Sequence, residues 1–341
     1  MSERRVSLLY RSAGLAMASL LLAAAVQAQD IREHTFRFAL QPAKGTSQVQ
    51  GAQKFADLVS AKSGGKITVK VFEGGTLGND VAVLSSMQGG TIDFSLMSVG
   101  TLASHNKQFS VFDFPYMFNT EAEADAVLDG PVGNKLLAKL PEKGFIGLAY
   151  AELGFRHIHN SKRPIKTLAD LQGLKIRVIP VPIYLDFMNQ EGANAVPMSY
   201  TELYPALEQK AVDGATNPFQ NIEYSKMYEV TKYLSLTRHM YSAMFFIGSK
   251  KTWDKLTPDE RKLIQQAADE AKVFQRTAAR ETNARALESL KKTMVVNEIP
   301  EAEIAKMRER AKPVIEKWTR EVGPDLVAEV NAELAKVRAA K

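Results

Sequence analysis

Short apolar segments alternate with longer amphipathic segments along the first third of the chain. The pattern predicts strands over residues 34–40, 66–72 and 92–97, separated by helices over 47–63 and 79–88. A pair of glycines follows each of the two helical segments and supplies its stop signal. This alternation of strand and helix is typical of a parallel sheet that is covered on both faces.

The same alternation returns in the middle of the chain. It predicts strands over 145–151, 174–179 and 193–196, with one helix near Leu168 and another over 181–191. Because single cores stop growing at about 250 to 300 residues, two α/β layers and two lobes are expected. The expected bounds are 29–152 with part of 240–280 for lobe I, and 153–239 with part of 281–320 for lobe II.

A long helical segment follows the second layer. Apolar residues recur at helical spacing over residues 258–293, with no interior Gly or Pro, and Thr257 stands where an N-cap is expected. At 1.5 Å per residue this segment would be about 54 Å long, so we expect it to bridge both lobes. The alternative to one bridging helix is a pair of shorter helices with a break near Thr282. Two further helices, split at Gly323, complete the chain, and the last occupies 321–341.

The N-terminal segment has the order of a secretory signal. Arg4, Arg5 and Arg11 lead into an apolar run over residues 13–26, and small residues precede an expected cleavage site after Ala28. The run of about 14 residues is short for a membrane-spanning helix, although an uncleaved anchor is the alternative. The chain contains no Cys, which excludes disulfides, thiolate chemistry and lipidation of a new N-terminal Cys. We therefore expect a secreted, periplasmic protein.

Composition and charge narrow the class of partner. Hydrophobic residues make up 45% and charged residues 24% of the chain, as in an ordinary globular protein. The formal charge of +6 falls to +4 without residues 1–28, which carry three arginines and one glutamate. This balance weakly favours anionic ligands and gives no support for nucleic-acid binding, because the basic residues lie among acidic ones without interleaved aromatics.

Motifs for catalysis are weak. His157 and His159 share a face of an expected strand and could ligate a metal, but no third ligand lies at a suitable spacing, so polar strand residues are the favoured interpretation. The loop 74–78 is glycine-rich but lacks the Lys-Ser/Thr of a phosphate-binding loop, so a tight turn is favoured. No nucleophile elbow is present. We expect no enzyme activity, no cofactor and no metal.

A few polar and aromatic residues could bind an anion. Arg177 lies at the carboxyl end of an expected strand, where a guanidinium can clamp a carboxylate through two parallel hydrogen bonds. Arg156 is a second candidate. Each arginine could equally be a surface residue paired with an acid, Asn217 could be a helix N-cap, and Tyr200 and Phe219 could be core aromatics.

Several motifs in order resemble one family, the substrate-binding subunits of tripartite ATP-independent periplasmic (TRAP) transporters, or DctP family. The residues that carry the resemblance are 74–78, 89–94, 173–178, 197–209 and 212–218. The resemblance covers nearly all of the chain after the signal segment. It implies an α/β, two-lobed periplasmic binding protein clamshell in which a long helix bridges both lobes.

The resemblance also implies roles for single residues. Arg177 would form the main salt bridge to a substrate carboxylate, Arg156 and Asn217 would hold the same group, and Tyr200 would lie over the ligand. Candidates at the ends of the first strands, from lobe I, are Gln41, Ser47, Asn79 and Ser98. Sialic-acid binders of the family carry an acid where this chain has Ser98, which disfavours a sialic acid.

The partners implied are a small organic acid anion and the small and large integral membrane subunits of a TRAP transporter, with uptake driven by an ion gradient. The receptor is expected to be a monomer. A ligand-loaded periplasmic sensor is the alternative from another class, followed by a periplasmic enzyme that acts on a carboxylic acid. The sequence does not choose among dicarboxylates, 2-oxo acids, sugar acids and aromatic acids.

Overall fold

The computed structural model describes residues 30–339, so the expected signal segment and its cleavage site at Ala28 lie outside the described residues. The strands are β1 His34–Ala39, β2 Ile67–Phe72, β3 Phe94–Ser98, β4 Phe145–Asn160, β5 Lys175–Val178, β6 Asn194–Pro197, β7 Gly214–Asn217, β8 Tyr233–Ser249 and β9 Val295–Asn297. The α-helices are α2 Ser47–Lys62, α3 Asp80–Gly89, α4 Glu121–Asp129, α5 Pro131–Leu137, α6 Pro182–Gln190, α7 Tyr200–Glu208, α8 Phe219–Tyr224, α9 Lys250–Trp253, α10 Pro258–Leu290, α11 Glu301–Val322 and α12 Pro324–Ala339.

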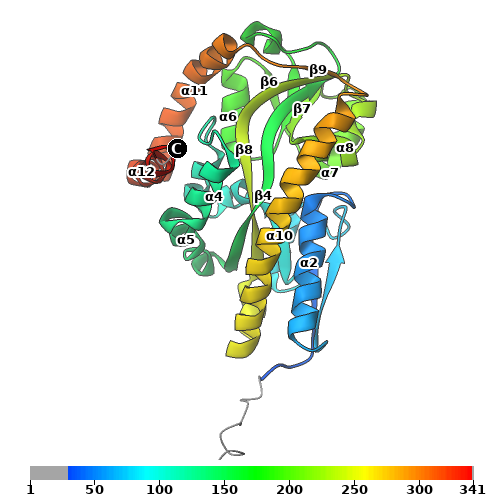
Figure 1. Ribbon diagram of the computed structural model, residues 1–341, viewed down its shortest axis with the longest axis vertical. Helices are drawn as coiled ribbons and strands as arrows, with labels where there is room; N and C mark the ends of the chain where they lie inside the picture. The colour runs from blue at the N-terminus through cyan, green and yellow to red at the C-terminus, as the bar shows by residue number, and fades with distance from the viewer. Residues whose placement is uncertain (1–29, 340–341) are drawn as a thin grey trace, which may run out of the picture.

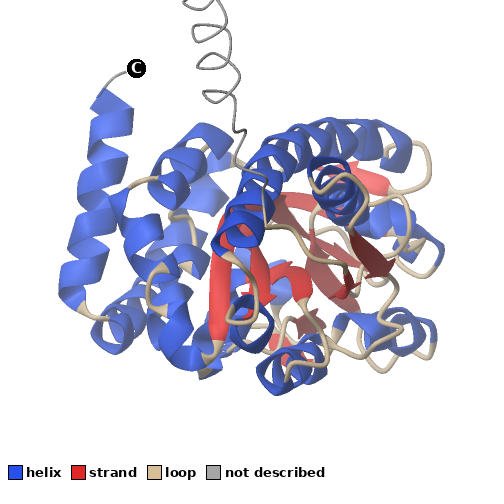
Figure 2. Cartoon of the chain, turned by 90° about the horizontal axis from the view of Figure 1, so that it is seen from below, coloured by secondary structure: helices blue, strands red, loops and turns tan. Residues whose placement is uncertain are grey.

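The described strands form one mixed sheet, with helices on both of its faces (Figures 1 and 2). Its order is β2-β1-β3-β8-β4-β7-β5-β6, with β9 paired to β8. The outer groups β1–β3 and β5–β7 are parallel within themselves. The two central strands, β4 and β8, are antiparallel to each other and to β3 and β7. The prediction of parallel layers therefore holds for the outer groups and is wrong for the centre.

The two central strands are much longer than the pattern indicated. β4 has 16 residues and β8 has 17, whereas the pattern predicted a strand over 145–151 and a separate one around His157 and His159, and none over β8. Both strands are buried on both faces along nearly all their length, so they lack the alternation of polar and apolar residues that reveals a half-exposed strand. Register shifts along the pair, one of them between Glu152 and Gly154, mark β-bulges that bend the strands.

Helix α10 is one unbroken helix of 33 residues, and the alternative of two helices is wrong. It packs against α2 at one end of the molecule and against α8 at the other, as Figure 1 shows for the yellow-orange helix. In the C-terminal third of α10, the Asn283 side-chain nitrogen donates to the Leu153 carbonyl, and its Oδ1 accepts from the backbone amide of Gln220 in the first turn of α8. The place where a break was the alternative, Thr282 and Asn283, is therefore continuous helix, and Asn283 joins α10 to β4 and α8.

The last two helices begin and end close to where they were predicted. Gly323, at a φ of +101°, separates α11 from α12, so the final helix begins at Pro324 instead of 321. Helix α11 packs on α6, and α12 packs on α4. Among the described residues, no helix is both long and apolar enough to cross a membrane.

The start of α10 gives a test of its capping. Thr257 accepts a hydrogen bond from the Glu260 amide, Glu260 accepts one from the Thr257 amide, and the Thr257 hydroxyl also donates to the Asp30 carbonyl. Thr257→Ala should lower the free energy of unfolding by about 1 kcal/mol, measured by urea denaturation. Thr277→Ala, on the exposed face of the same helix, is the control and should leave stability nearly unchanged. Equal effects at both positions would show that the cap contributes nothing specific.

Candidate functional site

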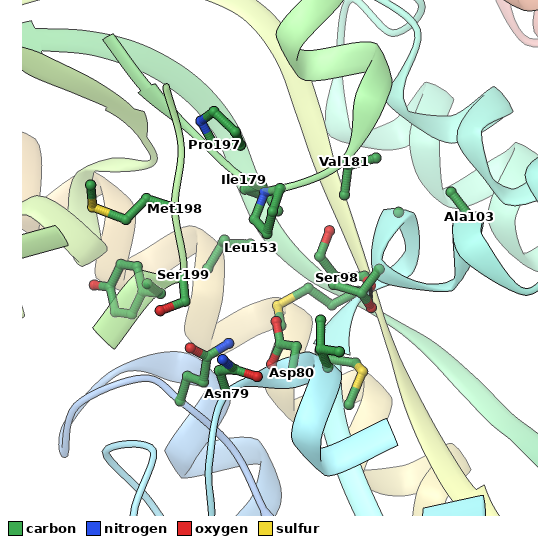
Figure 3. A pocket seen from close by; sticks show the side chains of 18 of the residues that line it. Asn79, Asp80, Ser98, Ala103, Leu153, Ile179, Val181, Pro197, Met198 and Ser199 are labelled. Atoms are coloured by element: carbon green, nitrogen blue, oxygen red, sulfur yellow. Dashed lines mark hydrogen bonds between the residues drawn. The ribbon is translucent and has the colours of Figure 1, made fainter. Parts of the chain in front are cut away.

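A cavity of about 770 Å³ lies between the two outer groups of strands, within the range of small-molecule sites. One wall comes from the end of β3, the start of α3 and the chain after β1. The opposite wall comes from the segments that follow β5, β6 and β7. Figure 3 shows Asn79 and Asp80 on one side, and Ile179 and Pro197 on the other.

Arg177 lies on β5, and its side chain is almost fully buried, with 2% of the residue exposed. Its Nε and Nη2 donate to the Met198 carbonyl, at 2.9 and 2.7 Å, while Nη1 makes no hydrogen bond within the described part of the chain. No described carboxylate forms an ion pair with it. Burial and the nearby charge of Arg156 lower the pKa of Arg177 to about 9, which still leaves it charged at neutral pH.

Arg156 lies on β4 and is 1% exposed. Its Nε donates to the Thr216 hydroxyl and its Nη1 to the Ser242 hydroxyl, both at 3.1 Å, and its Nη2 donates to the Thr216 carbonyl. The ring of Tyr184 lies beside its guanidinium, at 5.5 Å. Like Arg177, it has no ion-pair partner among the described residues, and burial lowers its pKa.

Neither buried guanidinium group has a carboxylate within ion-pair distance among the described residues, although Asp113 and Asp80 lie near enough to act on the pKa of Arg156 and of Arg177. A buried charge is costly unless it is paired, and hydroxyls and carbonyls satisfy the hydrogen bonds of these groups without neutralising them. Their partners hold the two groups in place, and both line the same cavity. An anion in the cavity would supply the missing negative charge.

Asn217 ends β7 and also lines the cavity, so it is a strand residue and not the helix N-cap that its sequence allowed. Its amide nitrogen donates to His159 Nε2 at 3.0 Å. Burial and the charges of both arginines lower the pKa of His159 to about 3. His159 is therefore neutral and can accept this bond, while its Nδ1 lies 3.0 Å from the Thr231 hydroxyl.

The metal alternative for the two histidines gains no support. The two ring nitrogens of His159 are bonded to Asn217 and Thr231. His157 stacks on Phe219 with ring centroids 4.2 Å apart. No group of three or more His, Cys, Asp or Glu side chains within residues 30–339 could hold a metal ion.

Tyr200, the first residue of α7, lines the cavity, and its ring centre lies 5.9 Å from the guanidinium carbon of Arg177. Its hydroxyl is bonded to the Ser225 hydroxyl at 2.7 Å, which fixes the ring. The tyrosine thus packs against the arginine that the sequence indicated as the main anion ligand.

Two of the predicted site residues do not line the cavity. Phe219 packs against His157, behind β7. Ser47 begins α2 and is fully buried: its amide donates to the Gln220 side chain, and its hydroxyl accepts from Gln275. Both are committed to contacts that join elements, so the expectation that they face a ligand is corrected.

Gln41, Asn79 and Ser98 do line the cavity, from the lobe I side. Asn79 is the N-cap of α3 and accepts from the Ala82 amide. The Gln41 Oε1 and the Ser98 Oγ are buried and have no hydrogen-bond partner within the described residues. Because protein atoms enclose both oxygens, a ligand in the cavity would reach them only after these side chains turned.

Sequence reasoning missed other polar residues of the cavity, among them Gln48, Asp80, Ser199 and Glu202. Asp80 and Glu202 lie in the first turns of helices, where acids are common because they complement the helix dipole. Because acids are expected there in any helix, their positions in the sequence gave no sign that they line a cavity.

The fold and site define a two-lobed solute-binding protein whose cavity is built for an anion. Residues 38–321 match the family of bacterial extracellular solute-binding proteins, family 7 (DctP). The chain belongs to this family, which confirms the resemblance seen in the motifs.

Named relatives and solved structures are consistent with this family membership. The chain is 35% identical over 272 residues, 80% of this chain and 83% of the relative, to the 2,3-diketo-L-gulonate-binding periplasmic protein YiaO of Escherichia coli. It is 32% identical over 304 residues, 88% and 90% of the two chains, to the C4-dicarboxylate-binding periplasmic protein DctP of Rhodobacter capsulatus. The crystal structure of the sugar acid binding protein DctPAm from Advenella mimigardefordensis, in complex with galactonate, superposes with a TM-score of 0.89 at 42% identity, covering 90% and 99% of the two chains.

The buried histidine gives a prediction for pH. The pKa of His159 is about 3 in the folded chain and about 6.5 when unfolded, so between these values the unfolded chain binds more protons. Its contribution to stability is therefore present above pH 6.5 and is lost as the pH falls toward 3. Relative to His159→Gln, the wild type should lose roughly 1 kcal/mol of unfolding free energy per pH unit below about pH 6. Urea denaturation at pH 7, 6, 5 and 4.5 measures both slopes. Parallel slopes would contradict a neutral, buried His159.

Proposed function

We propose that this protein captures a small organic acid by its carboxylate, between Arg177 and Arg156, and delivers it to TRAP membrane subunits. Membership of the solute-binding family makes the chain a receptor and not an enzyme. The observation that supports the role of the two arginines is their burial at one cavity without any ion-pair partner among the described residues. The named relatives bind diketogulonate, C4-dicarboxylates and galactonate, which all carry a carboxylate.

The arginines would divide the work of binding. Arg177 lines the cavity, its Nη1 has no hydrogen-bond partner among the described residues, and the Met198 carbonyl fixes the rest of its planar group, so it could donate to a carboxylate oxygen. Each of the three guanidinium nitrogens of Arg156 already donates to a protein oxygen. Arg156 would therefore act mainly through its charge and through the N–H groups that these bonds do not use. Asn217 and Tyr200 border the same place and would complete the pocket around the carboxylate.

Closure of the lobes would bury the bound anion. Residues 29–152 would move as lobe I and 153–239 as lobe II, with the bend at the bulges of the β4–β8 pair near Glu152 and Gly154. Removing water strengthens the charge-assisted hydrogen bonds, because the local dielectric falls. The closed, loaded receptor would be the form that the membrane subunits recognise, after export of the chain to the periplasm.

The identity of the bound acid can be tested directly. Protein purified without denaturation should release an organic acid, detected by mass spectrometry. The same acid should raise the melting temperature, because a ligand at 100 times its Kd adds about 2.7 kcal/mol of stability. Recovery of a neutral or cationic solute instead would contradict the proposal.

Substitution of Arg177 tests the site. Arg177→Ala should weaken binding of that acid by about 3 kcal/mol, roughly 100-fold in Kd, because the ligand carboxylate would be buried without its partner. The Kd of Arg177→Lys should lie between those of the wild type and Arg177→Ala, since lysine keeps the charge and loses the planar fork. Arg320→Ala, an exposed arginine on α11, is the control. Calorimetry measures all four proteins, and an unchanged Kd in Arg177→Ala would remove this residue from the site.

A further inference from the structure

Two loops follow the first two strands of the sheet and are bonded to each other. The loop after β2, residues 73–78, turns at Gly74 and Gly75, whose φ angles of +68° and +72° have the sign that both central residues of a type I′ turn require. The amides of these glycines donate to the carbonyls of Pro42 and Leu40, at 3.0 and 3.1 Å, in the loop after β1. Pro42 lines the cavity, so the two loops form one edge of its lobe I wall.

Gly75 packs against the opposite wall of the cavity. A Cβ atom on Gly75 would lie 2.5 Å from Cγ2 of Thr201, which is closer than Cβ atoms approach other atoms in proteins. Thr201 lies in the first turn of α7, between Tyr200 and Glu202, and both of these neighbours line the cavity. The two walls therefore meet directly beside the cavity, at a point where one of them has no side chain.

The methyl group of Thr201 is the atom that fills this place. The Thr201 hydroxyl is bonded to the Ser199 hydroxyl at 3.1 Å, so the side chain cannot rotate away from Gly75 without losing that bond. The next nearest atoms to a Cβ on Gly75 are the Gly78 carbonyl oxygen at 3.8 Å and Thr201 Cβ at 3.9 Å, which are ordinary contacts. The methyl group alone thus decides whether a side chain at residue 75 fits.

The neighbouring glycine has the same backbone conformation without this contact. A Cβ atom on Gly74 would meet no atom of residues 30–339 within 4 Å, apart from its own chain neighbours. Because both glycines have positive φ, a side chain at either position strains the backbone to a similar degree. Only a side chain at Gly75 would also hold the two walls apart.

We propose that Gly75 is a positioning residue for ligand binding: its missing side chain lets the loop 73–78 pack on Thr201, and this contact sets how closely the two walls surround a bound anion. The proposal rests on the proposed function, because it takes the cavity as the ligand site and closure as part of binding. A ligand that contacts both walls gains affinity when they approach fully. A side chain at residue 75 weakens binding without touching the ligand.

The experiment compares five ligand-free proteins by calorimetry: the wild type, Gly75→Ala, Gly74→Ala, Thr201→Ser and the double variant Gly75→Ala/Thr201→Ser. Each is titrated with galactonate, erythronate, glucuronate and succinate, and the acid that the wild type binds most tightly is used for the comparison. Gly75→Ala should raise the Kd for that acid at least tenfold, because the walls must then stay apart or overlap. Gly74→Ala should stay within threefold of the wild type.

The double variant isolates the contact from the backbone strain. Thr201→Ser removes the methyl group and keeps the hydroxyl that bonds to Ser199, so it makes room for a Cβ at residue 75. The Kd of the double variant should therefore return to within threefold of that of Thr201→Ser alone, although the strain of Gly75→Ala remains.

The separation of the walls gives a readout that does not depend on affinity. The chain contains no Cys, so Lys70→Cys on β2 and Glu208→Cys on α7, both at exposed positions, can carry a pair of spin labels. At a saturating concentration of the acid, pulsed electron paramagnetic resonance should find a longer distance between the labels in Gly75→Ala than in Gly74→Ala.

The outcomes separate this inference from the proposed function. A Kd that Gly75→Ala raises less than tenfold, an equal effect of Gly74→Ala, or a double variant that does not recover overturns the role of Gly75, even when Arg177→Ala abolishes binding. If none of the acids binds to the wild type, both proposals fail. If Gly75→Ala does not melt cooperatively, Gly75→Asn and Gly74→Asn replace the alanine pair with the same thresholds, because asparagine tolerates positive φ.

Discussion

The burial of two guanidinium groups that have no ion-pair partner within residues 30–339 is the constraint on which the site depends. Each group is held by neutral oxygens: Arg177 by the Met198 carbonyl, and Arg156 by Thr216 and Ser242. These bonds fix the direction of the donors and leave each guanidinium without an ion-pair partner among the described residues. A folded chain tolerates such an arrangement only where a cavity admits water or an anion, so the same feature that lowers stability creates affinity.

The histidine beneath the site follows from this constraint. His159 lies close to both arginines, and their charges add to burial in lowering its pKa. A protonated imidazole would add a third buried positive charge. As a neutral ring it instead accepts from Asn217, which brings that residue to the edge of the cavity without adding charge.

The sheet and α10 position the residues of the cavity in the two halves of the molecule. Arg156 lies on β4, a strand that pairs with β8 along its length, so it is anchored in the most extensively bonded part of the fold. Arg177 lies on the short strand β5 of one outer group, and Asp80 follows the opposite group. The ligand would therefore contact both halves, while α10 packs against α2 in one and α8 in the other. If the lobes close as proposed, binding and closure would be coupled, because a ligand that contacts both walls favours their approach.

Local sequence patterns predicted the outer strands β1, β2, β3, β5 and β6, the helices α2, α3 and α6, and the long α10, because each is a short apolar run or an amphipathic segment with turn or capping residues at its ends. The fully buried outer strand β7 was not predicted. Local patterns did not determine the central pair β4 and β8, because strands buried on both faces lack alternation and their pairing joins residues nearly a hundred positions apart. The motifs around Arg177 and Asn217 predicted from the sequence two residues that line the cavity and that we propose bind the carboxylate. Only the tertiary structure showed that Ser47 and Phe219 join elements instead of lining the cavity, and that Asp80 faces it, because a residue at a helix start has the same sequence signature whether it faces solvent or a ligand.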